Sequence, residues 1–505
     1  MPVQATKIKI PEKFQPERHP KCYFPRRYII TLLSFFGMFN VYAMRVNLSV
    51  AMVAMINSTV DTSENTTRYT AECPLLIHED TRDENKGFKG EQYHWDSKTQ
   101  GMILGAFFYG YVITQIPGGM MSEKVGAKWI YGGGVLITAI FSLLTPLAAS
   151  WGIGAFVTVR VLEGLGEGVT FPSMNTIISN WAPKLERSRI STFIHTGAQM
   201  GNVFSMPISG WLSSSDLLGG WPSVFYVFGT LGCLWFLLWS ILVYETPKSH
   251  PGISSRELQH IQKNKDDKPQ KKPKVPWLTL FTSLPMWSVI IAHIGHNFGF
   301  LILLTELPTY LSSILHFNIK SNGLLSALPY IVEAISAWIF SFCADRLRHS
   351  GKLSITTIRK VFNSIGLFGP AACLLGVTVS GCNPELIIGL FTLAMALNGG
   401  VYSGFNVTHV DMNPDLAGTT FGITNAISNL SGIIGPTVVG YFTASGATRA
   451  NWSSVFYITA GVYTVCGAFF AMFASAELQP WIKHTENDTK NTKPEKSFYS
   501  IETKS

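Results

Sequence analysis

Long apolar runs recur along almost the whole chain and are separated by short polar segments. A helix needs about 20 apolar residues to cross the roughly 30 Å hydrocarbon core of a bilayer, and each run is long enough. The pattern predicts twelve transmembrane helices, at residues 28–56, 99–122, 129–149, 155–181, 190–213, 221–244, 285–314, 321–343, 361–380, 385–409, 417–443 and 452–476. The expected fold class is therefore an all-α integral membrane protein in a lipid bilayer.

Charge changes this picture by fixing an orientation. Only 14% of the 505 residues are charged, against roughly 25% in an average soluble domain. Lysine and arginine concentrate before the first run, in 1–27, and in the segment 245–284, so the positive-inside rule predicts that both lie in the cytoplasm. No small-residue cleavage signal follows the first run, which we interpret as a retained helix. The net charge of +8 is thus an orientation signal and does not indicate a nucleic-acid partner.

One long segment, 58–97, is predicted to lie on the opposite side of the membrane. Two sequons begin at Asn57 and Asn65, and we expect both asparagines to carry glycans. The sequon at Asn487 falls in the cytoplasmic tail and should stay unmodified.

The seven cysteines show neither metal-ligand nor CxxC spacing, and we expect no metal site. Cys73 and Cys382 both fall in outward segments, where either a disulfide or two free thiols are compatible with the sequence.

The two halves of the chain repeat one another. WPSVFY from Trp221 matches WSSVFY from Trp452, and the pair Glu123-Lys124 matches Asp345-Arg346. Such repeats are typical of transporter folds. The predicted organisation is a cytoplasmic tail (1–27), a six-helix half (28–244), a cytoplasmic linker (245–284), a second six-helix half (285–476) and a cytoplasmic tail (477–505).

Several motifs resemble a known family. GMMSEKVGAK and its second copy CADRLRHSGK resemble the signature loop of the major facilitator superfamily, in which such charges latch the halves at the cytoplasmic face. The resemblance thus implies a cytoplasmic gate of Glu123, Lys124, Asp345 and Arg346. The stretches VYAMRVNLSVAM, GAFFYGYVITQIPGG, RVLEGLGEGVTFP, NWAPKLERSR and LSALPY resemble the anion/cation symporter family, which includes sialin, type I sodium/phosphate cotransporters and vesicular glutamate transporters.

This resemblance covers about residues 28–478 and is nearest to sialin. Glu163 agrees with the sialin pattern, whereas vesicular glutamate transporters have glutamine there. Leu104 and His296 stand where those transporters have histidine and arginine, so the pattern does not favour glutamate loading. The sialin pattern lacks acids at Glu306 and Glu333, which leaves open a related branch such as the inorganic phosphate cotransporters.

The fourth predicted helix carries three charges on one face. Arg160, Glu163 and Glu167 are spaced i, i+3 and i+7. An ion near the bilayer centre costs about 2.5 to 3.5 kcal/mol even on insertion scales, so such residues face the interior and mark pathways or proton relays. We predict proton coupling by the two glutamates with Arg160 as their switchable partner. A static Arg160–Glu163 pair that fastens the helix is the alternative.

Candidate substrate ligands come from both halves. Arg45 presents a planar fork that fits a carboxylate or phosphate, unless it snorkels to the outer surface. Tyr42, Tyr109 and Tyr111 either bind substrate or only pack. In the seventh predicted helix, His293, His296 and Asn297 lie within one turn and either line the opposite wall of a cavity or form interhelical hydrogen bonds.

Two further acids lie in the second half. Glu333 falls near the middle of the predicted helix 321–343, and we include it among the proton-coupling candidates. Glu306 falls near the outer end of the predicted helix 285–314, where we expect it to be solvated.

These patterns predict a secondary active transporter for a small organic anion, an acidic sugar or carboxylate, coupled to protons by alternating access. A sodium-coupled inorganic phosphate cotransporter and an anion channel are the alternatives. The chain has no HExxH or GxSxG motif, so an enzyme is not expected. We expect a monomer in the plasma membrane or a lysosomal or vesicular membrane, with no cofactor besides the coupling ion, H⁺ or Na⁺.

Overall fold

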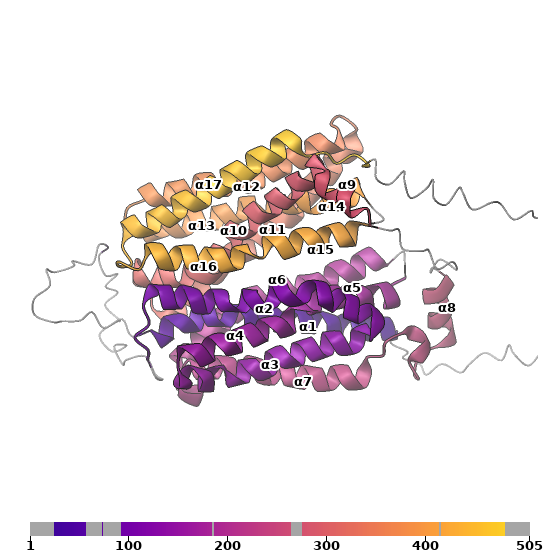
Figure 1. Cartoon of the computed structure of the whole chain (residues 1–505), viewed down its shortest axis with the longest axis horizontal. Helices are drawn as coiled ribbons and strands as arrows, with labels where there is room; N and C mark the ends of the chain where they lie inside the picture. The colour runs from indigo at the N-terminus through magenta and orange to yellow at the C-terminus, as the bar shows by residue number, and fades with distance from the viewer. Residues whose placement is uncertain are drawn as a thin grey trace, which may run out of the picture.

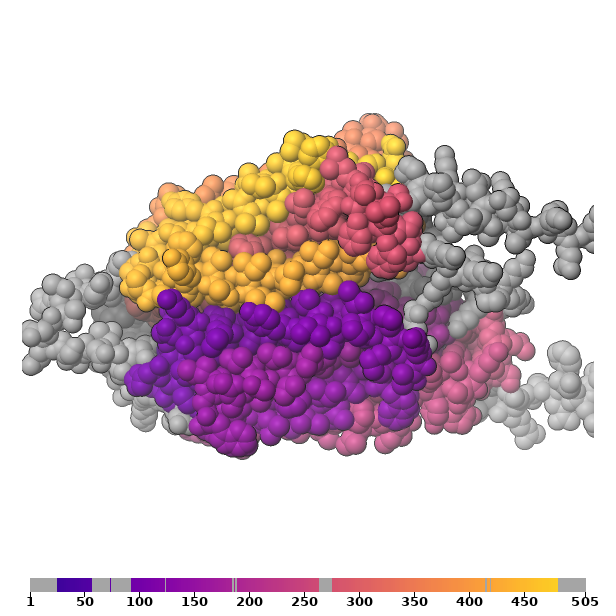
Figure 2. Space-filling model, in the orientation of Figure 1, coloured from indigo at the N-terminus to yellow at the C-terminus, as the bar shows by residue number. Residues whose placement is uncertain are grey.

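The computed structural model of the protein describes residues 25–56, 73, 92–183, 186–263, 275–413 and 416–479. These residues form a bundle of helices in two halves that lie side by side, one built from the first part of the chain and one from the last (Figure 1). The space-filling view shows the two halves in contact along one face (Figure 2). The asparagines of the three sequons, Asn57, Asn65 and Asn487, lie outside the described residues.

The first half contains α1 (Arg26–Met55), α2 (Ser97–Lys124), α3 (Ala127–Trp151), α4 (Ile153–Gly168), α5 (Thr170–Trp181), α6 (Arg187–Ser214) and α7 (Pro222–Leu242). The second contains α10 (Leu284–Ser313), α11 (Ile319–Ser350), α12 (Ile355–Val379), α13 (Pro384–Asn398), α14 (Phe405–Met412), α15 (Ala417–Ser428), α16 (Ser431–Phe442) and α17 (Arg449–Phe473). Each predicted apolar run coincides with one helix or with consecutive shorter helices. Among the described residues, eight spans are long and apolar enough to cross a membrane by length and composition.

Three of the predicted runs are interrupted. The run 155–181 breaks between α4 and α5, where Pro172 cannot donate a backbone hydrogen bond and instead lies in the first turn of α5. The run 385–409 passes through a short 3₁₀ segment, η5 (Gly399–Tyr402), between α13 and α14. The run 417–443 breaks between α15 and α16. Discontinuous helices are typical of transporter binding sites.

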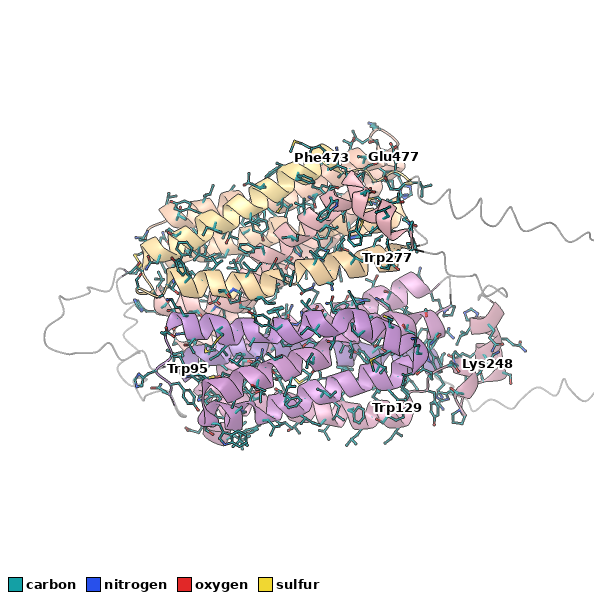
Figure 3. All side chains as sticks on the ribbon, viewed as in Figure 1. Trp95, Trp129, Lys248, Trp277, Phe473 and Glu477 are labelled. Atoms are coloured by element: carbon teal, nitrogen blue, oxygen red, sulfur yellow. A yellow bond between two sulfur atoms is a disulfide. The ribbon has the colours of Figure 1, made fainter. Side chains whose placement is uncertain are left out.

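The two ends of the bundle are distinct. Trp95 lies at one end of the first half, and Lys248, Trp277 and Phe473 lie at the other end of the bundle (Figure 3). The second end also holds the linker helices α8 (Ser255–Lys263) and α9 (Trp277–Thr282). We call this the inner end, following the positive-inside rule.

The outer ends of the two halves pack closely through glycines. A Cβ at Gly101 of α2 would lie 2.3 Å from the Pro436 carbonyl oxygen of α16, and a Cβ at Gly210 of α6 would lie 3.2 Å from the Gly323 Cα of α11. Only glycine permits such contacts between helices. The bundle is therefore closed on the outer side.

The inner ends of α2 and α11 are exposed. Lys124, Asp345 and Arg346 all face solvent and form no ion pair with one another, while the side chain of Glu123 lies outside the described part. The described members of the predicted cytoplasmic gate, Lys124 on α2 and Asp345 and Arg346 on α11, thus form no ion pair between the two halves in this structure.

The linker helix α8 is attached to the first half. Glu257 of α8 accepts hydrogen bonds from the backbone N–H groups of Arg26 and Arg27, both at 3.0 Å, at the start of α1. His260 of α8 lies 3.2 Å from Glu186, which also pairs with Arg27 at 3.0 Å. Part of the linker predicted from the sequence is therefore docked helix.

Cys73 and Cys382 form a disulfide, with 5.4 Å between their Cα atoms. Cys73 follows α1 in the first half, and Cys382 lies in the turn between α12 and α13 of the second half. The sequence left this pairing open. The bridge joins the two halves covalently on the outer side.

Candidate functional site

Two arginine–glutamate pairs lie side by side in the centre of the first half. Arg45 of α1 donates to Glu167 of α4 from Nε at 2.6 Å and from a second guanidinium nitrogen. Arg160 pairs with Glu163 one turn away on α4 and donates to the Arg45 carbonyl oxygen at 3.4 Å. All four side chains are buried, where an uncompensated charge would be costly, and each arginine is neutralised by the glutamate with which it pairs.

This arrangement revises the expected partner of Glu167. From spacing on one helix, Arg160 was predicted to serve both glutamates, but the structure gives Arg160 to Glu163 and Arg45 to Glu167. The sequence could not predict the Arg45–Glu167 pair, because α1 and α4 are far apart in the chain and meet only in the folded structure.

Glycine packing positions these charges. A Cβ at Gly164 would lie 1.9 Å from the Phe107 carbonyl oxygen, and one at Gly110 would lie 2.0 Å from the Val161 carbonyl oxygen. Backbone contact between α2 and α4 thus places Phe107 beside both guanidinium groups. Its ring centre is 5.2 Å from the Arg45 guanidinium carbon and 5.5 Å from that of Arg160.

Aromatic rings enclose the Arg45 guanidinium. Its central carbon lies 4.3 Å from the Tyr42 ring centre and 4.6 Å from that of Tyr111. Tyr109 does not take part in this enclosure, because it is 50% exposed on the face of α2 that also exposes Ile113 and Ile116. This face is the one expected to contact lipid.

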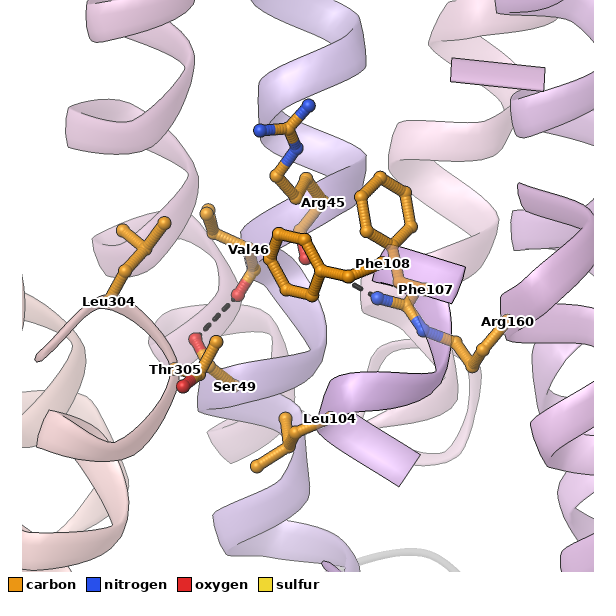
Figure 4. A pocket seen from close by; sticks show the side chains of 9 residues that line it. All are labelled: Arg45, Val46, Ser49, Leu104, Phe107, Phe108, Arg160, Leu304 and Thr305. Carbon is orange, nitrogen blue, oxygen red and sulfur yellow. Dashed lines mark hydrogen bonds between the residues drawn. The ribbon is translucent and has the colours of Figure 1, made fainter. Parts of the chain in front are cut away.

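A small pocket opens between the two halves at this site. Arg45, Arg160 and Phe107 approach it from the first half, and Leu304 and Thr305 of α10 approach it from the second (Figure 4). Val46, Ser49, Leu104 and Phe108 complete its lining. The pocket has a volume of about 10 Å³, which is room for about one water molecule.

In the second half, polar side chains form a separate buried cluster. His293 Nδ1 lies 3.0 Å from Thr424 Oγ1, and His409 Nε2 lies 2.8 Å from the same oxygen. Asn297 Nδ2 donates to Ser428 Oγ at 2.8 Å. His293 and Asn297 therefore form the interhelical hydrogen bonds that were the alternative to substrate binding. His409 was missed because it stands alone in its run.

His296 differs from its two neighbours. Its Nδ1 has no hydrogen-bond partner among the described residues, and its ring centre is 6.2 Å from that of Tyr402. The Tyr402 hydroxyl in turn accepts a hydrogen bond from Gln199 of α6, at 3.2 Å. His296 therefore lies beside Tyr402, a residue that contacts the first half.

Both acids of the second half are buried. Glu333 of α11 is 2% exposed, as its position in the middle of a span predicted. Glu306 of α10 is only 4% exposed, so the expectation that it is solvated is wrong. The reason is that α10 lies among α1, α11, α16 and α17 along most of its length.

The part of the chain that the structure describes contains no group of three histidine, cysteine or acidic side chains that could hold a metal ion. The chemistry available at the centre is therefore that of arginine, carboxylate and aromatic side chains.

The chain matches the Major Facilitator Superfamily over residues 28–436. It belongs to this family. Sialin from Homo sapiens is 42% identical over 458 residues, which cover 90% of each chain. A putative inorganic phosphate cotransporter from Drosophila melanogaster is 41% identical over 483 residues, covering 94% of this chain and 89% of the relative. Vesicular glutamate transporter 2 from Homo sapiens is 37% identical over 480 residues, covering 94% of this chain and 78% of the relative.

Solved structures agree on the fold. A bacterial homologue of the human lysosomal transporter spinster, in an inward-facing and unoccupied conformation, superposes with a TM-score of 0.68 at 14% identity, covering 91% of this chain and all of that one. A D-xylose–proton symporter gives a TM-score of 0.65 at 13% identity, covering 90% of this chain and 99% of that one. The protein is thus a multi-pass membrane transporter with the major facilitator fold, and it is not an enzyme. The predicted nearness to sialin and the anion/cation symporters is confirmed.

Proposed function

We propose that the protein moves a small organic anion, an acidic sugar or carboxylate, across the membrane together with protons by alternating access. The observation that carries this proposal is the buried Arg45–Glu167 pair beside the pocket between the halves. Arg45 is the cation best placed for an anion, and its present partner is a group that can take up a proton.

Anion and proton binding are linked through this pair. A substrate carboxylate that binds the Arg45 fork replaces the Glu167 carboxylate, because one guanidinium edge cannot serve both anions with the same hydrogen bonds. Glu167 then lacks a counter-charge in a buried site, where the neutral acid is favoured over the ion. Substrate therefore promotes protonation of Glu167, and protonation of Glu167 releases Arg45 for substrate.

Arg160 and Glu163 have a supporting part in this scheme. Arg160 donates to the Arg45 carbonyl oxygen and remains paired with Glu163. The pair keeps a second guanidinium at the pocket without adding net charge. A change at Glu163 should thus alter the pH dependence of transport more than its capacity.

Sodium-coupled phosphate transport is the second candidate. The relative from Drosophila melanogaster named a putative inorganic phosphate cotransporter is 41% identical, almost as similar as sialin, and a guanidinium fork binds phosphate as readily as carboxylate. An anion channel is the third.

A substrate panel separates these candidates. Purified protein in proteoliposomes would be given radiolabelled sialic acid, glucuronate, glutamate, urate and phosphate under an imposed proton gradient, an imposed sodium gradient, or neither. Our proposal predicts concentrative uptake of an organic anion only with the proton gradient. Phosphate uptake driven by sodium favours the second candidate, and flux that never exceeds equilibration favours a channel. We expect the protein in the plasma membrane or a lysosomal or vesicular membrane.

A further inference from the structure

The buried acids of the two halves differ in whether they have a basic partner. In the first half, Glu163 and Glu167 are each paired with an arginine. In the second half, both carboxylate oxygens of Glu333 and one of Glu306 have no hydrogen-bond partner among the described residues. An unpaired ion at such a depth is costly, so a group of this kind is held as the neutral acid or takes up a cation.

The surroundings of Glu333 contain phenols and no cation. Tyr330 of α11, Tyr402 of η5 and Tyr463 of α17 are the groups with which it interacts electrostatically. The hydroxyls of Tyr330 and Tyr463 also lack partners in the described part of the chain. From α10, the His296 ring centre lies 6.2 Å from that of Tyr402. No described group offsets a negative charge on Glu333.

Glu333 is also joined to the contact between the halves. A Cβ at Gly399, the first residue of η5, would lie 2.5 Å from Ser336 Oγ and 3.1 Å from the Glu333 carbonyl oxygen, so α11 packs directly on the interrupted segment. The last residue of that segment, Tyr402, accepts the hydrogen bond from Gln199 of the first half. A change of charge at Glu333 therefore acts on a segment that touches the other half.

We propose that Glu333 is a second proton-binding residue, separate from the Arg45–Glu167 pair, and that Tyr402 links its protonation to the movement of the halves. In the conformation of this structure the carboxyl group holds its proton. Movement of η5 against α11 exposes the group to water, on one side of the membrane when the proton is taken up and on the other side, later in the cycle, when it is released. The proposal rests on proton coupling at the first site and adds one proton to each transport cycle.

The test is the proton stoichiometry. Steady-state accumulation of the anion would be measured in proteoliposomes at several imposed pH gradients, with the membrane potential clamped by potassium and valinomycin. The logarithm of the accumulation ratio rises with the pH difference, and its slope gives the number of protons that accompany each anion. Glu333→Gln, an isosteric neutral change, should lower the slope by one and leave accumulation possible.

Two further variants test whether a lowered slope is specific to Glu333. Glu385→Gln makes the same change at an exposed acid at the start of α13 and should leave the slope unaltered. Tyr402→Phe removes the hydroxyl that binds Gln199, and because this contact is the proposed link between Glu333 and the movement of the halves, the variant should lower the slope as Glu333→Gln does.

Three results would overturn the proposal. One is an unaltered slope in Glu333→Gln, and another is a slope lowered by Glu306→Gln in its place. The third is a slope of zero in Glu333→Gln with the wild-type slope intact, which makes Glu333 part of the only proton site. If the wild type itself shows no slope, the proposed proton coupling fails before this inference is reached.

Discussion

At the scale of single residues, the site is built from two arginine–glutamate pairs whose charges neutralise one another. The apolar runs make Arg45, Arg160, Glu163 and Glu167 conspicuous, so their burial could be predicted from the sequence. Their pairing could not, because Arg45 and Glu167 meet only when α1 packs beside α4. Which tyrosine of α2 faces the site was also beyond prediction, since this helix is apolar on all sides.

Arg45→Lys tests whether the fork matters or only the charge. An ammonium group cannot reproduce the two parallel hydrogen bonds of a guanidinium, so anion uptake should fall by about ten-fold or more at normal surface expression. Radiotracer uptake in proteoliposomes measures this. Lys248→Arg, the reverse exchange at an exposed lysine of the inner end, should have little effect. Uptake at the wild-type rate in Arg45→Lys would remove Arg45 from the binding site.

At the scale of helices, Gly110 and Gly164 form a seam along which the backbones of α2 and α4 touch, and this close packing places Phe107 beside the Arg45 and Arg160 guanidinium groups. The helix ranges follow closely from the apolar runs, because each run is long enough to cross a bilayer. The interruptions at Pro172 and at η5 were not predicted, since apolar residues continue on both sides of each break.

Gly164→Ala should disturb the seam between α2 and α4. The added methyl group meets the Phe107 carbonyl oxygen at 1.9 Å, so the helices must separate, at a cost of about 1 to 3 kcal/mol. We expect a lower melting temperature in detergent and a large loss of uptake. Gly154→Ala on the same helix is the matched control, because no atom lies within 4 Å of its added Cβ. Equal behaviour of the two variants would contradict a role for the seam.

Docking of α8 should be insensitive to pH over the neutral range. Burial raises the pKa of the Glu186 carboxyl, but His260 and Arg27 outweigh it and the net pKa is lowered. Because the pKa is lower in the folded protein, the ionised Glu186 stabilises the folded state at any pH above its unfolded pKa of about 4.3. This stabilisation is lost only when the pH falls through the lower, folded-state pKa. A nitroxide at Gln259, with Cys22 of the tail and the exposed Cys343 replaced by serine, should stay immobile from about pH 7 to 5. Mobility gained near pH 6 would contradict this account.

At the scale of the whole molecule, the chain is two repeated halves whose outer ends pack closely and whose described charges at the inner ends of α2 and α11 form no ion pair with one another. The repeat was readable from WPSVFY and WSSVFY, and with it the division into halves. The conformation was not readable, because alternating access requires one sequence to adopt two packings of similar free energy.

The disulfide gives a direct test of how the halves are joined. A protease site placed within 264–274 would cut the chain between them. After cleavage the halves should migrate together on a non-reducing gel and separately after reduction, because Cys73 and Cys382 bridge them. Cys382→Ser should separate without reduction. Separation of the wild-type halves without a reductant would refute the bridge.

The central claim is that Glu167 takes up a proton when an anion displaces it from Arg45. Glu167→Gln abolishes the titration and keeps the size of the side chain. The measurement is uptake at several imposed pH gradients beside counterflow exchange in the same vesicles, which needs no net proton movement. We predict that Glu167→Gln loses accumulation driven by the pH gradient and retains exchange. Accumulation in this variant with the wild-type dependence on the gradient would contradict the account.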